Sequence, residues 1–214
     1  MGGFQGSLSS CTAPDLGAVA IKEVVARSGL QPSDIDEVIF GCVLPAGLKQ
    51  GPARQAMRQA GLPDSTGATT INKICGSGMK AVMQAADAIK AGSAQIVVAG
   101  GMESMSNAPY LLEKARAGYR MGHGKIVDHM FQEGLEDAET GLSMGVLAQE
   151  MADKKGYTRE QQDQYAIGSL NKAIAAIQGG FFKDEIVPVT VSSRKGDVVV
   201  DQDEQPLNAK VDKI

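Results

Sequence analysis

Hydrophobic positions near the start of the chain follow two different periods, and each period predicts a different element of secondary structure. From Pro14 to Gly29, apolar residues recur at helical spacing, which indicates an amphipathic helix that begins at a proline and ends at a glycine. The run from Pro52 to Ala60 has similar spacing and predicts a second, shorter helix. Between these helices, the apolar run from Val38 to Phe40 predicts a short strand.

The next segment predicts a strand, a helix and another strand in close succession. Ala68 to Ile71 is typical of a strand, Asn72 to Gly78 of a glycine-rich turn, and Gly78 to Ala91 of a helix. Gln95 to Ala99 is a continuous apolar run, which indicates a strand covered on both faces. A strand, a helix and a strand in about thirty residues form a βαβ unit, which predicts a parallel sheet with helices packed on it. The apolar stripe of the helix consists of Met79, Val82, Met83, Ala86 and Ile89.

The sequence changes character near Ser106, where we expect a domain boundary that separates residues 1–105 from residues 106–214. Tyr110 to Glu139 is rich in charged residues and glycine and predicts a long loop region. Two amphipathic helices are then expected, at Gly145 to Lys154 and at Arg159 to Gln178. Beyond them, the apolar runs Ile186 to Val191 and Val198 to Val200 predict two strands joined by a turn.

Composition and charge exclude several classes of protein. A hydrophobic content of 43% and a charged content of 21% are ordinary for a globular domain, so a disordered or coiled-coil chain is excluded. The net charge of -4 argues against binding of nucleic acid through bulk charge. We find neither a membrane-spanning apolar run nor a secretion signal, so we expect a soluble, cytoplasmic protein with no nucleic-acid or membrane partner.

Three cysteines, Cys11, Cys42 and Cys75, are the candidate nucleophiles. Their odd number and the absence of a C-x-x-C pair predict free thiols and no metal site. Cys75 directly precedes the expected helix at Gly78, where unpaired amides and the helix dipole favour a reactive thiolate. Gly76 and Gly78 would let a substrate carbonyl approach the backbone closely.

Two other interpretations of the same turn remain open. Free cysteines are commonly buried, so Cys75 could be a core residue in a tight connection. The run from Gly76 to Lys80 is also glycine-rich and ends in lysine, as phosphate-binding loops do. It lacks the full spacing of such a loop, however, which argues against nucleotide binding.

Longer stretches of the chain resemble one known family. The string from Asn72 to Ala81 is similar to the nucleophile signature of the thiolases, the acetyl-CoA C-acetyltransferases. Gly100 to Tyr110 resembles a second thiolase signature. Further similar stretches are Gly47 to Gln55, Tyr119 to Gly124 and Phe182 to Val189, so the resemblance covers essentially the whole chain.

The resemblance implies a fold and a reaction. The fold would be a thiolase-like α/β fold, with a mixed, mostly parallel sheet, helices on both faces and an inserted loop domain from residue 106. Cys75 would carry an acyl group as a thioester, for the condensation of two acetyl-CoA molecules or the cleavage of 3-ketoacyl-CoA by CoA. Acyl-CoA is then a substrate, and no permanently bound cofactor is implied. The implied role is in fatty acid metabolism, in a homo-oligomer.

Three further motifs of the family have no counterpart in the sequence. They are a Gly-His-Pro motif with the histidine that activates the cysteine, a Cys-x-Gly-Gly-Gly motif, and a Gly-Asn-x-Ser-type motif. We therefore expect the chain to be the amino-terminal half of a thiolase, without the first strand and without the carboxy-terminal half. We expect this isolated chain to have little or no thiolase activity. His123 and His129 are expected to be solvated loop histidines that do not replace the missing base.

The resemblance also implies residues that contact CoA. Leu135 and Met144 match positions that line the pantetheine channel, although either could equally be an ordinary core residue. Ser143 stands where biosynthetic thiolases often have a histidine, so a preference for four-carbon substrates is not implied. A locally basic stretch would face the CoA phosphates or simply be solvated; it comprises Arg116, Arg120, His123 and Lys125.

Two functions of another class remain as alternatives. The chain could be a non-catalytic CoA-binding or dimerisation module, or a fragment without an independent role. Glu103 lies beside the expected site and is interpreted as a structural residue.

Overall fold

The computed structural model describes all 214 residues, and the chain divides into two compact units. One unit consists of Cys11–Leu135, and the other of Met1–Ser10 together with Glu136–Ile214. Residues 106–135 thus cluster with the residues before them. The domain boundary expected between residues 1–105 and residues 106–214 stays a prediction.

A three-stranded parallel sheet forms the centre of the first unit. Its order is β2-β1-β3, with β1 at Glu37–Gly41, β2 at Gly67–Ile71 and β3 at Val97–Gly101. Gly41 pairs with Ile71 on one side and with Gly101 on the other. The carboxyl ends of all three strands therefore meet at a single edge of the sheet, and the loops that follow them lie together.

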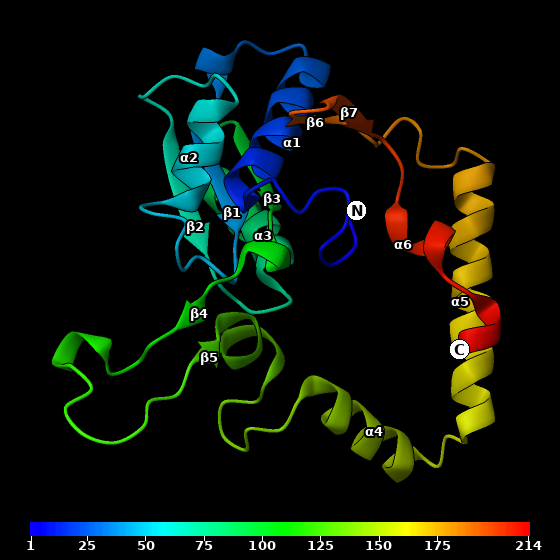
Figure 1. Cartoon of the computed structure of the whole chain (residues 1–214). Coiled ribbons are helices and arrows are strands. Elements are labelled where there is room, and N and C mark those ends of the chain that lie inside the picture. Colours follow the sequence, from blue (N-terminus) through cyan, green and yellow to red (C-terminus); the bar gives the residue numbers. More distant parts are fainter. The chain divides into compact units, whose positions relative to one another are not determined.

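Helices cover both faces of this sheet, as expected for an α/β fold. Alternate residues of β1 point to opposite faces: Val38 and Phe40 pack in one core cluster and Ile39 in another. The first cluster contains residues of α1 (Ala13–Ser28) and α2 (Pro52–Gln59), which lie side by side in Figure 1. The second cluster contains residues of α3 (Ser77–Lys90).

Local signals explain where α1 begins and ends. The Thr12 side chain caps its first turn and exchanges hydrogen bonds with Asp15 in a capping box. Gly29 ends the helix in the left-handed conformation, with φ of 72°. The helix predicted from Pro14 to Gly29 is therefore confirmed.

The helix α3 presents small residues to the sheet and large ones to solvent. Its buried residues are Ser77, Ala81 and Ala85. The helix predicted at this place is confirmed, but its apolar stripe does not enter the core of the unit. Four large side chains of the stripe are exposed: Met79, Val82, Met83 and Ile89.

The strand β3 differs from its prediction in position and in burial. It spans Val97–Gly101 instead of Gln95–Ala99, and its residues are half-buried or exposed. β3 lies at an edge of the sheet, whereas the central strand β1 is the one that is buried along most of its length. The apolar run therefore predicts the strand correctly, but the strand is not covered on both faces as expected.

The segment after residue 105 contains only short elements. A 3-10 turn at Met105–Asn107 leads to β4 (Tyr110–Leu111), which pairs antiparallel with β5 (Val127–Asp128). A π-helical turn at Phe131–Leu135 ends the first unit.

The second unit is built from helices and one hairpin. The helices are α4 (Met144–Lys155), α5 (Arg159–Gln178) and the short α6 (Glu204–Asn208), which packs against α5. The antiparallel hairpin consists of β6 (Val189–Ser193) and β7 (Gly196–Val200). The helices predicted at Gly145 to Lys154 and Arg159 to Gln178 are confirmed, and the first hairpin strand begins three residues later than predicted.

Glu204 ties the start of the chain to this unit. Its carboxylate accepts hydrogen bonds from the backbone N–H groups of Gly3 and Ser7 and from the Ser7 hydroxyl. These bonds, the Gly3 one first, hold the pKa of the Glu204 carboxyl below its usual value. None of the helices of the structure combines the length and the apolar character that a membrane span requires.

Candidate active site

Cys75 lies in the turn between β2 and α3, one residue before the helix N-cap Gly76. Its thiol is free, and its side chain is exposed. The prediction that Cys75 directly precedes a helix is confirmed, and the alternative of a buried core cysteine is wrong. A thiol at this place lies next to the positive end of the dipole of a 14-residue helix.

Side-chain hydrogen bonds hold the turn on both sides of Cys75. The Asn72 Oδ1 atom accepts the N–H of Ile74 at 2.9 Å. The Ser77 hydroxyl accepts the N–H of Lys73 at 2.8 Å and donates to the carbonyl of Ile74 at 2.6 Å. Asn72 and Ser77 therefore fix the backbone that carries the thiol.

The backbone at Ile74 is strained. Its φ of 49° is rare for a β-branched residue. Such a conformation costs on the order of 1–3 kcal/mol and persists only where neighbouring contacts enforce it. The hydrogen bonds of Asn72 and Ser77 supply that enforcement, so the conformation next to Cys75 is built into the turn.

Glycines let the start of α3 lie against the carboxyl ends of the strands. A Cβ added to Gly101, the last residue of β3, would lie 3.4 Å from the Cα of Gly78. A side chain at position 101 would thus be pressed against the backbone of the helix, and the glycine leaves no side chain between the two elements. This contact brings the loop after β3 close to the turn of Cys75.

Cys42 follows β1 and is a different kind of cysteine. It is only 1% exposed, and its thiol lies 3.6 Å from the Glu103 Oε1 atom. Burial above all, together with the charge and the hydrogen bond of Glu103, raises the pKa of the Cys42 thiol to about 12. Cys42 therefore stays protonated at neutral pH and is a core thiol that donates to Glu103.

Glu103 has a defined set of partners that the sequence did not show. Its Oε2 atom accepts the N–H of Val43 at 2.8 Å, and its Oε1 atom accepts the N–H of Leu44 at 3.0 Å. The glutamate thereby fixes the loop that follows β1. The residues it joins are about sixty positions apart in the sequence, a separation at which no local pattern reveals the contact.

The two histidines have opposite environments. His123 is exposed, as predicted. The prediction that His129 is solvated is wrong, since its side chain is 1% exposed. The backbone N–H of His129 donates to the carbonyl of Pro109, next to the pairing of β4 with β5. This pairing holds the His129 side chain in the interior. Its Nδ1 atom lies 3.6 Å from the Glu133 Oε1 atom, and neither ring nitrogen has a hydrogen-bond partner.

The residues expected to contact CoA belong to both units. Leu135 is half-buried at the end of the π-helical turn in the first unit. Ser143 is the N-cap of α4 in the second unit, where its hydroxyl accepts the N–H of Val146, and Met144 is 39% exposed. Their role in CoA binding stays a prediction. The basic residues Arg116, Arg120, His123 and Lys125 are all exposed.

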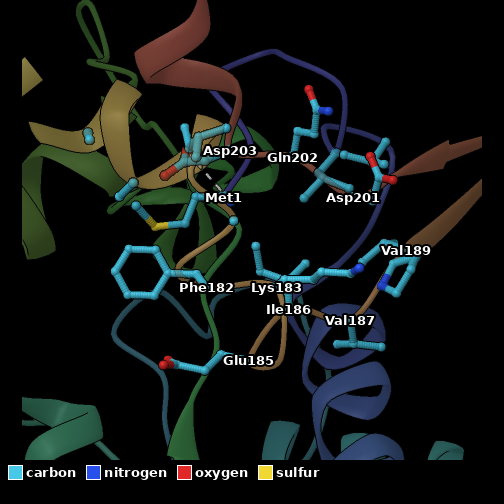
Figure 2. Close-up of a pocket in the computed structure, with 17 residues that line it drawn as sticks. Met1, Phe182, Lys183, Glu185, Ile186, Val187, Val189, Asp201, Gln202 and Asp203 are labelled. Carbon is cyan, nitrogen blue, oxygen red and sulfur yellow. Dashed lines mark ion pairs between the residues drawn. The ribbon is translucent and has the colours of Figure 1, made fainter. Parts of the chain in front are cut away.

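The second unit contains a cavity of about 700 Å³ between the end of α5 and the hairpin. Figure 2 shows its lining, with Phe182, Ile186 and Val187 around the space. The terminal amine of Met1 lies 3.7 Å from the Asp203 Oδ1 atom, the ion pair drawn as a dashed line. The lining holds no cysteine and no histidine, so this cavity offers none of the chemistry expected of Cys75.

Comparison with known proteins decides the family. The sequence model of the family described as "Thiolase, N-terminal domain" matches residues 1–214. The chain belongs to the thiolase family. The resemblance seen in the sequence is thus confirmed, and the family match includes the turn that carries Cys75.

Thiolases of several organisms are similar to this chain. Acetyl-CoA acetyltransferase of Pseudomonas aeruginosa is 52% identical over 207 residues, which are 96% of this chain and 53% of that protein. Acetyl-CoA acetyltransferase of Cupriavidus necator is 54% identical over 199 residues, or 93% of this chain and 51% of that protein. The chain therefore spans about half the length of these curated relatives.

A solved thiolase structure confirms the fold. The crystal structure of the acetyl-CoA acetyltransferase of Bacillus anthracis matches with a TM-score of 0.95 at 39% identity. The match covers 99% of this chain and 54% of that chain. The predicted thiolase-like α/β fold is confirmed for the part of the family's structure to which this chain corresponds.

Proposed function

We propose that Cys75 is the acyl-accepting nucleophile of an acetyl-CoA C-acetyltransferase. The observation that carries the proposal is an exposed, free thiol in a hydrogen-bonded turn at the start of α3, in a chain of the thiolase family. The Cys75 sulfur attacks the carbonyl carbon of acetyl-CoA, a new thioester bond forms, and the bond to the CoA sulfur breaks. CoA leaves as a thiolate and takes up a proton.

The α3 helix start supports this step in two ways. Its dipole favours the negative charge that develops on the reacting atoms during attack. Backbone N–H groups near the turn can donate to the thioester oxygen, on which negative charge develops in the tetrahedral intermediate. The enforced backbone at Ile74 keeps both features in place before the substrate binds.

The second half of the reaction needs groups that the 214 residues do not contain. Condensation requires a base that removes a proton from the α-carbon of a second acetyl-CoA. Cleavage of 3-ketoacyl-CoA requires an acid that returns a proton to the α-carbon of the acetyl-CoA that leaves. The sequence has neither a Gly-His-Pro nor a Cys-x-Gly-Gly-Gly motif, and the ring nitrogens of its buried His129 have no hydrogen-bond partner. We therefore propose that this polypeptide supports acylation and that complete turnover depends on a base supplied from outside it.

Binding of the CoA part is assigned to Leu135, Ser143 and Met144. Leu135 would offer an apolar wall to the pantetheine arm, and so would Met144, which follows Ser143 in the chain. The exposed basic stretch of Arg116, Arg120, His123 and Lys125 would face the phosphates. CoA thioesters are then substrates, with no permanently bound cofactor. We place the protein in the cytoplasm and in fatty acid metabolism.

One observation also favours association. The exposed large side chains on α3, Met79, Val82, Met83 and Ile89, form an apolar face that a soluble protein usually covers. We propose that the protein functions as a homo-oligomer or in contact with further thiolase residues. A purely non-catalytic dimerisation or CoA-binding module is the alternative that this face would support.

Incubation with acetyl-CoA distinguishes the two functions. For the nucleophile, we expect one acetyl group on the peptide that contains Cys75 and release of free CoA, and we expect neither in Cys75→Ala. The matched control Cys11→Ser should be acetylated like the parent chain, because Cys11 lies outside the turn. CoA binding without an acetyl group on Cys75 would contradict the proposal and favour the binding module.

A further inference from the structure

Glu103 lies at the same edge of the sheet as Cys75, in the loop that follows β3. Its carboxylate receives three donors from the loop that follows β1: the Cys42 thiol and the N–H groups of Val43 and Leu44. A single side chain thus connects the carboxyl ends of two neighbouring strands. Because the carboxylate accepts with both oxygens, it fixes the position and the orientation of the loop.

The hydrogen bonds continue from this loop to the turn of Cys75. The carbonyl of Val43 accepts the Nδ2–H of Asn72 at 3.4 Å. The Oδ1 atom of the same Asn72 side chain accepts the N–H of Ile74, the residue before Cys75. A contiguous route of hydrogen bonds therefore joins Glu103 to the strained residue Ile74 by way of Val43 and Asn72.

We propose that Glu103 is a positioning residue for Cys75, acting through Val43 and Asn72. The inference deepens the proposed function, because it assigns to Glu103 the control of the geometry in which the nucleophile is presented. Glu103 holds the loop after β1, the loop orients the Asn72 amide, and the amide holds Ile74 in its left-handed conformation. Without Glu103, the turn relaxes and the thiol loses its alignment with the start of α3.

Alkylation of Cys75 by iodoacetamide in the 214-residue chain tests the inference. Peptide mass spectrometry separates the rate at Cys75 from the rate at Cys11. We expect Glu103→Ala to lower the Cys75 rate by about three- to tenfold, the effect of losing one hydrogen bond of ordinary strength. Glu103→Gln should restore part of the rate, because the glutamine amide keeps one acceptor oxygen.

A matched control separates positioning from general destabilisation. The Thr66 hydroxyl donates to the carbonyl of Ile35 at 3.1 Å, at the amino ends of β1 and β2, and Thr66 is 3% exposed. Thr66→Val removes a buried hydrogen bond in the same unit but outside the route to Cys75. We expect it to lower the urea midpoint and to leave the Cys75 alkylation rate unchanged.

The Asn72→Asp variant tests the route. An aspartate can still accept the N–H of Ile74 but cannot donate to the carbonyl of Val43. In this background, we expect Glu103→Ala to have no further effect on the Cys75 rate. Because both variants in this comparison carry the aspartate, the effect of its charge on the alkylation rate cancels.

The outcomes separate this inference from the proposed function. It is overturned if Glu103→Ala leaves the Cys75 rate unchanged, if Thr66→Val lowers that rate equally, or if the effect of Glu103→Ala persists in the Asn72→Asp background. Acetylation by acetyl-CoA is a separate readout. A parent chain that is not acetylated, but whose alkylation depends on Glu103 as described, contradicts the proposed nucleophile role and leaves the positioning role in place.

Discussion

Gly41 and Ser77 approach so closely that no side chain fits between them. A Cβ added to Gly41 would lie 2.6 Å from the Cβ of Ser77 and 2.8 Å from the backbone nitrogen of Gly78. Gly41 ends β1 and Ser77 begins α3, so the start of the helix packs on the backbone of the central strand. Because Gly41 does not have a positive φ, lack of space is the reason for the glycine.

The substitution Gly41→Ala should therefore displace the start of α3. We expect it to lower the free energy of unfolding by about 1–3 kcal/mol, the usual cost of overpacking, and to slow the alkylation of Cys75. Urea unfolding and iodoacetamide kinetics measure the two effects.

The control for this substitution is Gly168→Ala in α5. A Cβ on Gly168 would meet nothing within 4 Å, and its φ is not positive. Alanine is the better helix former, so we expect a gain of about 0.5–1 kcal/mol in the second unit. Equal stability of Gly41→Ala and the parent chain would contradict the close packing of β1 and α3.

The sequence predicts those parts of this molecule that depend on neighbours along the chain. The capping box of Thr12 and the glycine at position 29 delimit α1, and the glycine-rich turn after β2 locates Cys75. The covered face of α3 could not be predicted in this way. It is chosen by the close approach of Gly41 and Gly101 to the helix, which favours small residues over the larger apolar stripe.

Long-range contacts account for the other differences. The sequence does not indicate what Glu103 binds, because its partners lie about sixty residues away in the loop after β1. The burial of His129 depends on the pairing of two-residue strands, which are too short for a periodic pattern. The position of Cys75 just before a helix could be predicted because both the helix signal and the family signature are local.

A pH-dependent contribution to stability is expected from Cys42, whose pKa of about 12 exceeds that of a thiol in the unfolded chain. Stability from the protonated thiol is fully present below the unfolded pKa and is lost as the pH rises toward the folded pKa. The parent chain should therefore lose its stability advantage over Cys42→Ala between about pH 9 and pH 12, by at most about 1.4 kcal/mol per pH unit.

Urea unfolding at a series of alkaline pH values measures this difference. The other two cysteines are present in both proteins, so their contributions cancel. A constant difference between the parent chain and Cys42→Ala across this pH range would show that Cys42 does not titrate as its burial requires.

The exposed face of α3 should respond to substitution differently from the buried face. We expect Met83→Glu to change the free energy of unfolding by no more than about 0.5 kcal/mol and to reduce self-association. Ala81→Met, at a position that is 0% exposed, should destabilise the chain by about 1–3 kcal/mol. Urea unfolding and sedimentation equilibrium test the pair. If Met83→Glu destabilised the isolated chain as strongly as Ala81→Met, the face would be covered within the chain itself.

The 214-residue chain should show little or no complete thiolase turnover. The reason is that the sequence contains neither the Gly-His-Pro histidine, which would activate Cys75, nor the Cys-x-Gly-Gly-Gly cysteine, which would transfer a proton at the α-carbon. Spectrophotometric measurement of CoA-dependent acetoacetyl-CoA cleavage tests this expectation, with Cys75→Ala as the blank. Robust turnover that is lost in Cys75→Ala would mean that a group within these residues acts as the base.

The most direct test of the account compares the iodoacetamide rate constant of Cys75 with that of free glutathione at the same pH and ionic strength. The start of α3 should make Cys75 react faster than glutathione, and Cys11, which lacks this environment, should not share the increase. A Cys75 rate no higher than that of glutathione would contradict the claim that the fold activates this thiol.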